Sequence, residues 1–259
     1  MKRKLWNKDT ILMLQGNAVS ALGDILYSVA IGYWVYEKTG SSALMGIMSS
    51  ISMFMTMLVM PFSGSIIDKC SRKLIIVGMD TLRGVIMLAL GGLAFADSLS
   101  VPVVLAAAFL ASACSVFFSP AVNTLMLDII PHDDMVRGQS VFSGVNSFVN
   151  LVGKAISGAL VAFLGVPLIV LLNGVSYLVS AFTELFITVP KTVHQGEKIT
   201  LGGIFADFRV AVREIFRNRY LKLFIPCALI LNLLSAGSMT LMLPFTLEKG
   251  FTVDMYGYL

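Results

Sequence analysis

Charged side chains are scarce in this sequence, and their scarcity excludes a soluble domain. Asp, Glu, Lys and Arg make up 13% of the 259 residues, whereas 57% are hydrophobic; soluble domains contain about 25% charged residues. Apolar runs of about 18 residues or more are typical of helices that cross a bilayer. We therefore expect an all-α polytopic protein of the cell membrane, with seven spans at roughly 10–36, 42–67, 74–96, 101–127, 138–164, 167–189 and 221–247.

Paired cysteines, histidine clusters and nucleotide-binding motifs are also lacking. The three cysteines, Cys70, Cys114 and Cys227, are far apart and form no C-x-x-C pair, and the two histidines fall in expected loops. This pattern argues against a disulfide framework and a zinc site. Neither G-x-x-x-x-G-K-[ST] nor H-E-x-x-H is present, so ATP-driven transport and zinc hydrolysis are unsupported. We expect no cofactor, no metal, no nucleic-acid partner and no enzyme activity.

Basic residues are distributed unevenly between the two ends of the expected spans. Most of the nineteen lysines and arginines precede the first span or follow the second, fourth and sixth. Only Lys38 and Lys249 lie in the opposite loops. Because cytoplasmic loops carry the excess of Lys and Arg, the N-terminus is predicted to lie in the cytoplasm.

The chain divides into three parts by hydropathy. Residues 1–189 contain six spans joined by short turns and are expected to form one transmembrane bundle. Residues 190–220 begin polar and continue with apolar residues on one helical face, opposite Arg209 and Arg213. This pattern predicts a cytoplasmic linker with an amphipathic helix on the membrane surface, the alternative being a plain linker. Residues 221–259 are expected to hold a seventh span and the start of a missing second half, so the chain reads as truncated.

Polar side chains recur at intervals of three and four residues along four of the spans, which places them on one face of each helix. A polar atom inside a bilayer must face protein or water. The stripes therefore indicate either a cavity or hydrogen bonds that hold helices together. The third span has no polar side chain after Arg83 and is expected to be an outer helix. The candidates for a substrate cavity are Asn17, Ser20, Tyr27, Ser28, Ser119, Asn123, Asn146 and Asn150.

Two charged residues lie about half-way along their spans, Asp24 in the first and Lys154 in the fifth. Charging a side chain at that depth costs at least about 2.5 kcal/mol. Both are candidates for proton coupling, and two interpretations stay open: a water-filled pathway lined by both groups, or a buried structural ion pair with no transport role. Glu184 lies near the cytoplasmic end of the sixth span, where we expect it to reach interfacial water and to be structural.

The turn GSIIDKCSRK, residues 64–73, concentrates charge between the second and third spans. We expect Gly64 to allow close backbone approach, Arg72 to reach Asp128, and Arg83 to pair with Asp80 at i, i+3. A cluster of this kind can form in one conformation and break in another, whereas the alternative is a plain topology signal. The candidate residues of this conformational latch are Gly64, Asp68, Lys69, Arg72, Lys73, Asp80, Arg83 and Asp128.

The order Gly-x-x-x-Asp-Lys-x-Ser-Arg-Lys in this turn resembles the signature between helices two and three of the major facilitator superfamily, with Ser71 where the family usually has glycine. Residues 21–42, 80–84 and 123–140 are similar to the drug:proton antiporter branch that includes macrolide-efflux-like proteins. The resemblance implies twelve spans in two six-helix halves, with the substrate cavity between the halves. Helices one, two, four and five would face the cavity or the other half, and helices three and six would lie outside.

By this resemblance, the chain is expected to have the major-facilitator fold, as the N-terminal six-helix half plus a seventh transmembrane helix. Its implied function is secondary active transport: proton-coupled efflux of drugs or other amphipathic small molecules by alternating access. The implied partners are the lipid bilayer, the substrate, protons, and a second half or a homodimer partner. Two alternatives stay open, a truncated protein that transports nothing and acts through a partner, and an uptake carrier of the same superfamily.

Overall fold

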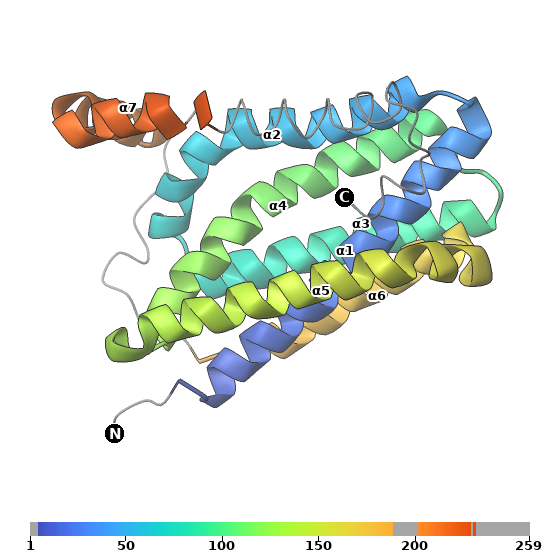
Figure 1. Cartoon of the computed structure of the whole chain (residues 1–259), viewed down its shortest axis with the longest axis horizontal. Helices are drawn as coiled ribbons and strands as arrows, with labels where there is room; N and C mark the ends of the chain where they lie inside the picture. The colour runs from blue at the N-terminus through green and yellow to red at the C-terminus, as the bar shows by residue number, and fades with distance from the viewer. Residues whose placement is uncertain (1–4, 189–200, 229, 232–259) are drawn as a thin grey trace, which may run out of the picture. The chain divides into compact units, whose positions relative to one another are not determined.

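The computed structural model describes residues 5–188, 201–228, 230 and 231. The described residues as far as Ile204 belong to one compact unit, and Phe205 begins a second. Figure 1 shows the first unit as a bundle of long helices. Its elements are α1 (Lys8–Thr39), α2 (Ser42–Lys69), α3 (Arg72–Phe95), α4 (Val101–Ile129), the short 3₁₀ turn η1 (His132–Asp134), α5 (Met135–Leu164) and α6 (Val166–Glu184).

These helices coincide with the first six predicted spans to within a few residues. Among the described residues, five helices are long and apolar enough to cross a membrane: α1, α3, α4, α5 together with η1, and α6. α2 has 28 residues and is about 42 Å long at 1.5 Å per residue, which exceeds the apolar thickness of a bilayer. The predicted seventh span falls largely outside the described residues, although 219–228 are helical.

Capping residues set several helix ends. The side chain of Asn7 accepts a hydrogen bond from the Thr10 amide at 2.8 Å and so begins α1, as N-cap residues do. Gly40 ends α1 with a φ of 63°, a conformation that glycine adopts without steric cost. Gly165, with a φ of 74°, is the one residue between α5 and α6, so the two helices turn back on each other directly.

Glycine allows α3 and α6 to pack closely. A Cβ atom added at Gly174 would lie 2.9 Å from the backbone nitrogen of Leu88, and one at Gly84 would lie 2.7 Å from the Leu178 side chain. Small residues at helix contacts are the usual way in which membrane helices approach each other. α6 also packs against α1, and α4 packs against both α2 and α3.

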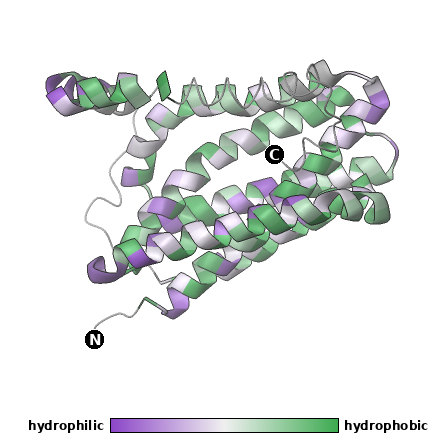
Figure 2. Ribbon diagram, viewed as in Figure 1, coloured by the Kyte–Doolittle hydropathy of each residue, from purple (hydrophilic) through white to green (hydrophobic). Residues whose placement is uncertain are grey.

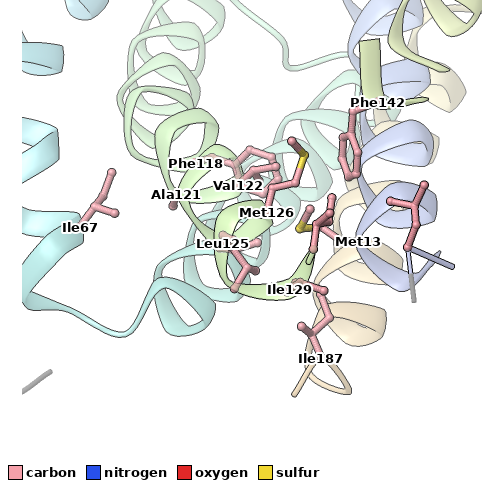
Figure 3. Close-up of a cluster of buried hydrophobic side chains, with 13 residues drawn as sticks. Met13, Ile67, Phe118, Ala121, Val122, Leu125, Met126, Ile129, Phe142 and Ile187 are labelled. Carbon is pink, nitrogen blue, oxygen red and sulfur yellow. The ribbon is translucent and has the colours of Figure 1, made fainter. Parts of the chain in front are cut away.

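Two apolar clusters fill the bundle, one toward each end. The first, shown in Figure 3, joins Met13 of α1, Ile67 of α2, Phe142 of α5 and the end of α4 around Leu125. The second contains Val35 of α1, Met87 and Leu90 of α3, Val104 of α4 and Val170 of α6. Between these residues in the sequence lie Asp24, Asp80, Arg83, Ser115 and Ser180, which form a polar layer between the clusters. Figure 2 shows hydrophilic segments within the otherwise hydrophobic bundle.

α7 (Leu201–Arg217) lies within the predicted linker. The prediction of a helix there is confirmed, and Arg209 and Arg213 are exposed. Its position on the membrane surface stays a prediction, and residues 190–200 lie outside the described residues.

Candidate functional site

A cavity of about 300 Å³ lies beside Asp24 inside the bundle. The predicted candidates Asp24, Tyr27 and Ser28 line it together. α3 and α6, which were expected to lie outside, contribute Met87 and Tyr177 to its wall. The interpretation of these two helices as outer scaffold is therefore incomplete. The remaining lining residues are Ile31, Gly32, Met48, Ala108, Ala111, Ser112 and Ser115.

Asp24 is held by α6 and faces a cation from α3. The hydroxyl of Tyr177 donates a hydrogen bond to the Asp24 carboxylate. The guanidinium carbon of Arg83 lies 4.5 Å from the centre of the Tyr177 ring and 4.2 Å from that of Phe118. A guanidinium between two aromatic faces is stabilised by the ring quadrupoles. The positive charge of Arg83 is thereby fixed close to the cavity carboxylate, and the two groups interact electrostatically.

Asp80 and Arg83 form the predicted pair one turn apart on α3, which confirms that prediction. Their side chains are 0% and 4% exposed, so the pair lies in the interior of the bundle. Arg83 also donates to the hydroxyl of Ser115 on α4 at 3.4 Å. A buried ion pair is stabilising only when such additional hydrogen bonds accompany it.

Glu184 joins this polar layer, which corrects the sequence-based interpretation. It was expected to reach interfacial water, but it is 1% exposed. Ser180 donates to its Oε1 atom at 3.2 Å, and its Oε2 atom has no hydrogen-bond partner among the described residues. The backbone of α1 covers both residues at Gly16, where an added Cβ would lie 2.9 Å from the Ser180 hydroxyl.

A second, smaller cavity of about 230 Å³ lies between α1, α4 and α5. Four predicted cavity residues line it: Asn17, Ser119, Asn123 and Asn146. Asn17 donates to the side-chain oxygen of Asn146 at 2.9 Å and so joins α1 to α5. The polar stripes of these three helices therefore face one another at this level of the bundle.

Lys154 and Asn150 line a third, more open pocket together with Asn146, Ser147 and Leu151. Lys154 is exposed, and the structure does not place it in the cavity of Asp24. Within the described residues no ion pair joins Asp24 to Lys154. The two proton-coupling candidates therefore belong to separate pockets, and the charge that accompanies Asp24 comes from Arg83.

Two further expectations are not met. Ser20 was a cavity candidate, but it is 3% exposed and its hydroxyl bonds to the carbonyl oxygen of Gly16, one turn earlier in α1. Gly64 was expected at a close backbone approach, yet an added Cβ would meet no described atom within 4 Å. Ser20 is thus a buried residue of the α1 packing face, and Gly64 lies on an open surface of this unit.

The charged turn makes one of the contacts that were predicted for a latch, and its role as a latch stays a prediction. Arg72 lies 2.5 Å from Asp128 at the end of α4, and both side chains are 16% exposed. The expected Arg72–Asp128 contact is therefore confirmed. Asp68 lies 4.0 Å from Arg72 and is 70% exposed, which makes it the weaker partner. Roles for Lys69 and Lys73 in a latch stay predictions.

The sequence-based candidates missed Tyr177 and gave Ser180 and Glu184 no functional role. A signal was present, since Asn173, Ser176, Ser180 and Glu184 recur at intervals of three and four along α6, the spacing of one helical face. Tyr177 lies on the same side of the helix. Asn173, Ser176 and Ser180 were apparent in the sequence, but the resemblance placed the sixth helix outside the cavity, so this stripe was given no functional role.

Comparison with known proteins identifies relatives along the chain. The family model described as Major Facilitator Superfamily matches residues 13–259. A Bacillus subtilis (strain 168) protein named as a bacilysin exporter is 30% identical over 217 residues, which cover 80% of this chain and 51% of that protein. Macrolide efflux protein A of Streptococcus pyogenes is 23% identical over 186 residues, 72% of this chain and 46% of that protein.

A third relative extends the similarity over more of the chain. An uncharacterized MFS-type transporter of Bacillus subtilis (strain 168) is 22% identical over 260 residues, 96% of this chain and 59% of that protein. The chain thus spans about half the length of the relatives that it matches.

Proposed function

Because this chain belongs to the Major Facilitator Superfamily, a family of membrane transporters rather than enzymes, we propose that it is part of an exporter of amphipathic small molecules that is driven by protons. The observation that carries the proposal is Asp24, an ionisable group in the wall of a largely apolar cavity inside a membrane bundle. Intramembrane carboxylates in water-accessible cavities are typical of proton relays. Two relatives named as an exporter and an efflux protein support outward transport.

In the proposed cycle, Asp24 binds the coupling proton and residues around the two cavities bind the substrate. Met48, Met87 and Ile31 offer apolar surface, while Ser112 and Tyr27 offer hydroxyl groups. This mixture suits a molecule with a large apolar body and a few polar groups. Asn17, Ser119, Asn123 and Asn146 provide a more polar region toward the α5 side.

The wider organisation follows from the family. We propose that residues 1–189 form one six-helix half, that 190–220 form a cytoplasmic linker, and that 221–259 begin the second half. Alternating access then consists of rocking the two halves about a site near the bilayer midplane. In this arrangement the N-terminus lies in the cytoplasm, in agreement with the distribution of basic residues.

The substitution Asp24→Asn in the complete transporter tests the proposal. It keeps the size of the side chain and its contact with Tyr177 but removes the ionisable group. We expect loss of efflux driven by a pH gradient in proteoliposomes, with normal membrane insertion. The matched control is Asp133→Asn, which neutralises an exposed carboxylate in η1 and should leave efflux unchanged. Efflux by Asp24→Asn with the wild-type rate and pH dependence would contradict the proposal.

The same proteoliposomes distinguish the two alternatives. An uptake carrier driven by protons would move substrate in the same direction as the protons flow, whereas the proposed exporter moves it in the opposite direction. A protein that acts only through a partner would show no substrate flux at all with either gradient.

A further inference from the structure

Within the part of the chain that the structure describes, the polar layer holds more acidic groups than its one cation, Arg83, can neutralise. Asp24 from α1, Asp80 from α3 and Glu184 from α6 all interact electrostatically with Arg83. The other titratable groups that face these carboxyls in the described residues are the Tyr27 and Tyr177 phenols and the Cys114 thiol. If all three carboxyls were ionised, the layer would carry two uncompensated negative charges in a medium of low dielectric constant, which is strongly unfavourable.

Three buried atoms of the layer also lack a hydrogen-bond partner among the described residues. Oδ2 of Asp80, Oε2 of Glu184 and Nε of Arg83 make no hydrogen bond within the described part of the chain. The three residues are 0%, 1% and 3% exposed, in that order. A carboxylate oxygen that is buried without a donor is a poor place for negative charge, and a bound proton removes that charge. The two unpartnered carboxyl oxygens, on Asp80 and Glu184, therefore lie where protons can be held.

Ser180 connects two of the carboxyls. Its hydroxyl donates to Oε1 of Glu184 at 3.2 Å and also faces the carboxyl of Asp80. A hydroxyl group has one hydrogen and two lone pairs, so it can accept a hydrogen bond from one neighbour while donating to another. Rotation of this hydroxyl group exchanges which of the two carboxyls accepts its hydrogen bond and which one donates to it.

We propose that Asp80, Ser180 and Glu184 form a proton-binding site between α3 and α6, outside the substrate cavity, which exchanges protons near the end of α6 and is coupled to Asp24 through Arg83. The site deepens the proposed function and rests on it only in taking the transported ion to be the proton. No residue of this site lines the cavity of Asp24, so this second proton site is separate from the cavity in which we propose that substrate and the Asp24 proton bind.

The transfer within the site is balanced. The O–H bond of the Glu184 carboxyl breaks as its proton moves to Oγ of Ser180, while the Ser180 hydroxyl proton moves to the carboxylate of Asp80 that this hydroxyl faces. Glu184 becomes a carboxylate, Asp80 becomes a carboxylic acid, and the serine is unchanged. Asp80 then no longer neutralises Arg83, so the cation is available to Asp24, and the ionised form of Asp24 is favoured. In this way a proton gained at one site is released at the other.

Glu184 is covered in this conformation, so proton exchange with water at this site requires a movement of the helices around it. It is the last residue of α6, and in the short turn that follows it Ile187 is buried in the first apolar cluster. The backbone of α1 at Gly16 covers its other side. In the proposed cycle, a displacement of α1 from α6 at Gly16 exposes Glu184 to water.

Infrared spectroscopy of the complete, purified protein tests the site without any transport assay. Protonated carboxylic acids have a carbonyl stretching band that carboxylates lack. We expect wild-type protein at neutral pH to show such a band, sensitive to exchange into D₂O, and Glu184→Gln to reduce it by the equivalent of one carboxyl per chain. Glu37→Gln, which replaces an exposed carboxylate of α1, is the control and should leave the band unchanged.

Ser180→Ala provides a second variant that retains all three carboxyls. Loss of the connecting hydroxyl should slow deuterium exchange of the band by roughly tenfold, the equivalent of one hydrogen bond. This variant decides the question if Glu184→Gln fails to fold. An unchanged exchange rate in Ser180→Ala, or an unchanged band in folded Glu184→Gln, overturns the proposal.

The two proposals fail separately. If efflux depends on the pH gradient and on Asp24 but the band is the same in Glu184→Gln, the proton site is wrong and the proposed function stands. If the band is lost in Glu184→Gln while no proton-driven efflux occurs, the site stands and the proposed function is wrong.

Discussion

The guanidinium of Arg72, at the start of α3, lies 2.5 Å from the carboxylate of Asp128, at the end of α4. Because both side chains are largely buried, this contact is a strong, charge-assisted hydrogen bond. It ties together two helix ends that the turn at residues 64–73 brings to one side of the bundle. The following predictions concern this contact and the polar layer within the bundle.

Asp128→Asn is expected to destabilise the bundle by about 2 kcal/mol, the usual value for a hydrogen bond to a charged group. Asp68→Asn should cost less than about 0.5 kcal/mol, since Asp68 is largely exposed and exposed ion pairs contribute little. Thermal unfolding of the purified protein measures both. Equal effects of the two substitutions would contradict the assignment of Asp128 as the main partner of Arg72.

If the contact is also a conformational latch, Asp128→Asn shifts the balance between the inward-open and outward-open forms of the complete transporter. Accessibility of single cysteines to impermeant reagents on each side of the membrane measures this balance. Asp133→Asn, a neighbouring exposed carboxylate, is the control. A stability loss without any change in accessibility would leave the contact as a purely structural one.

Arg83→Gln is expected to cost about 3–5 kcal/mol, because it leaves buried carboxylates without their cation. The double variant Arg83→Gln with Asp80→Asn should recover part of this loss, since it removes both members of the buried pair. Arg83→Lys is also expected to destabilise, because an ammonium lacks the planar group that stacks between Phe118 and Tyr177. A fully tolerated lysine would argue that the stacking contributes nothing.

Tyr177→Phe keeps the ring that faces Arg83 but removes the hydroxyl that donates to Asp24. We expect a loss of about 2 kcal/mol in stability, the value of one hydrogen bond to a charged group. Tyr33→Phe alters an exposed phenol of the same chain and should change stability by less than about 0.5 kcal/mol. The difference between their unfolding temperatures is the measured quantity.

Gly174→Ala is expected to destabilise the contact of α3 with α6 by about 1–3 kcal/mol, the range for overpacking. The new methyl group would meet the backbone of Leu88 at 2.9 Å, and a backbone atom has little freedom to move aside. Gly92→Ala is the matched control, because a Cβ there meets no described atom within 4 Å. Indistinguishable stability of the two variants would show that the helices separate more easily than the packing indicates.

Cysteine labelling tests the predicted topology, in which the N-terminus lies in the cytoplasm. With Cys70 and Cys227 replaced by serine, a cysteine at Ser98, between α3 and α4, should react with an impermeant thiol reagent outside the cell. A cysteine at Asp133, between α4 and α5, should react only after the membrane is permeabilised. The reverse pattern would invert the topology.

The helix positions could be predicted from the sequence because bilayer thickness fixes the length of an apolar run. The Asp80–Arg83 and Arg72–Asp128 pairs were also predictable, the first from helical spacing and the second from the order of the turns. The residues that surround Asp24 could not be predicted from the sequence. Which face of α6 meets α1 depends on the rotation of α6 about its own axis, and that rotation follows from the close approach of the two helices at Gly16 and Gly23. The periodicity of a single helix contains no information about it.

The separation of Asp24 from Lys154 illustrates the same limit. Similar depth along two helices made a pair feasible, but depth does not specify the angular position of a side chain around each helix axis. α5 presents Lys154 to a different pocket, and α3 supplies the cation instead. Glu184 was misplaced for a related reason, since proximity to a helix end does not imply access to water when another helix covers it.

The two apolar clusters at either end of the polar layer have an electrical consequence. A cell membrane stores energy as a voltage, and a continuous file of water through a protein would discharge it. The apolar side chains packed around Leu125 and around Val35 exclude water on both sides of the charged groups. The bundle can thus contain buried ionisable side chains without allowing an uncoupled leak of protons, which would dissipate the gradient that we propose drives transport.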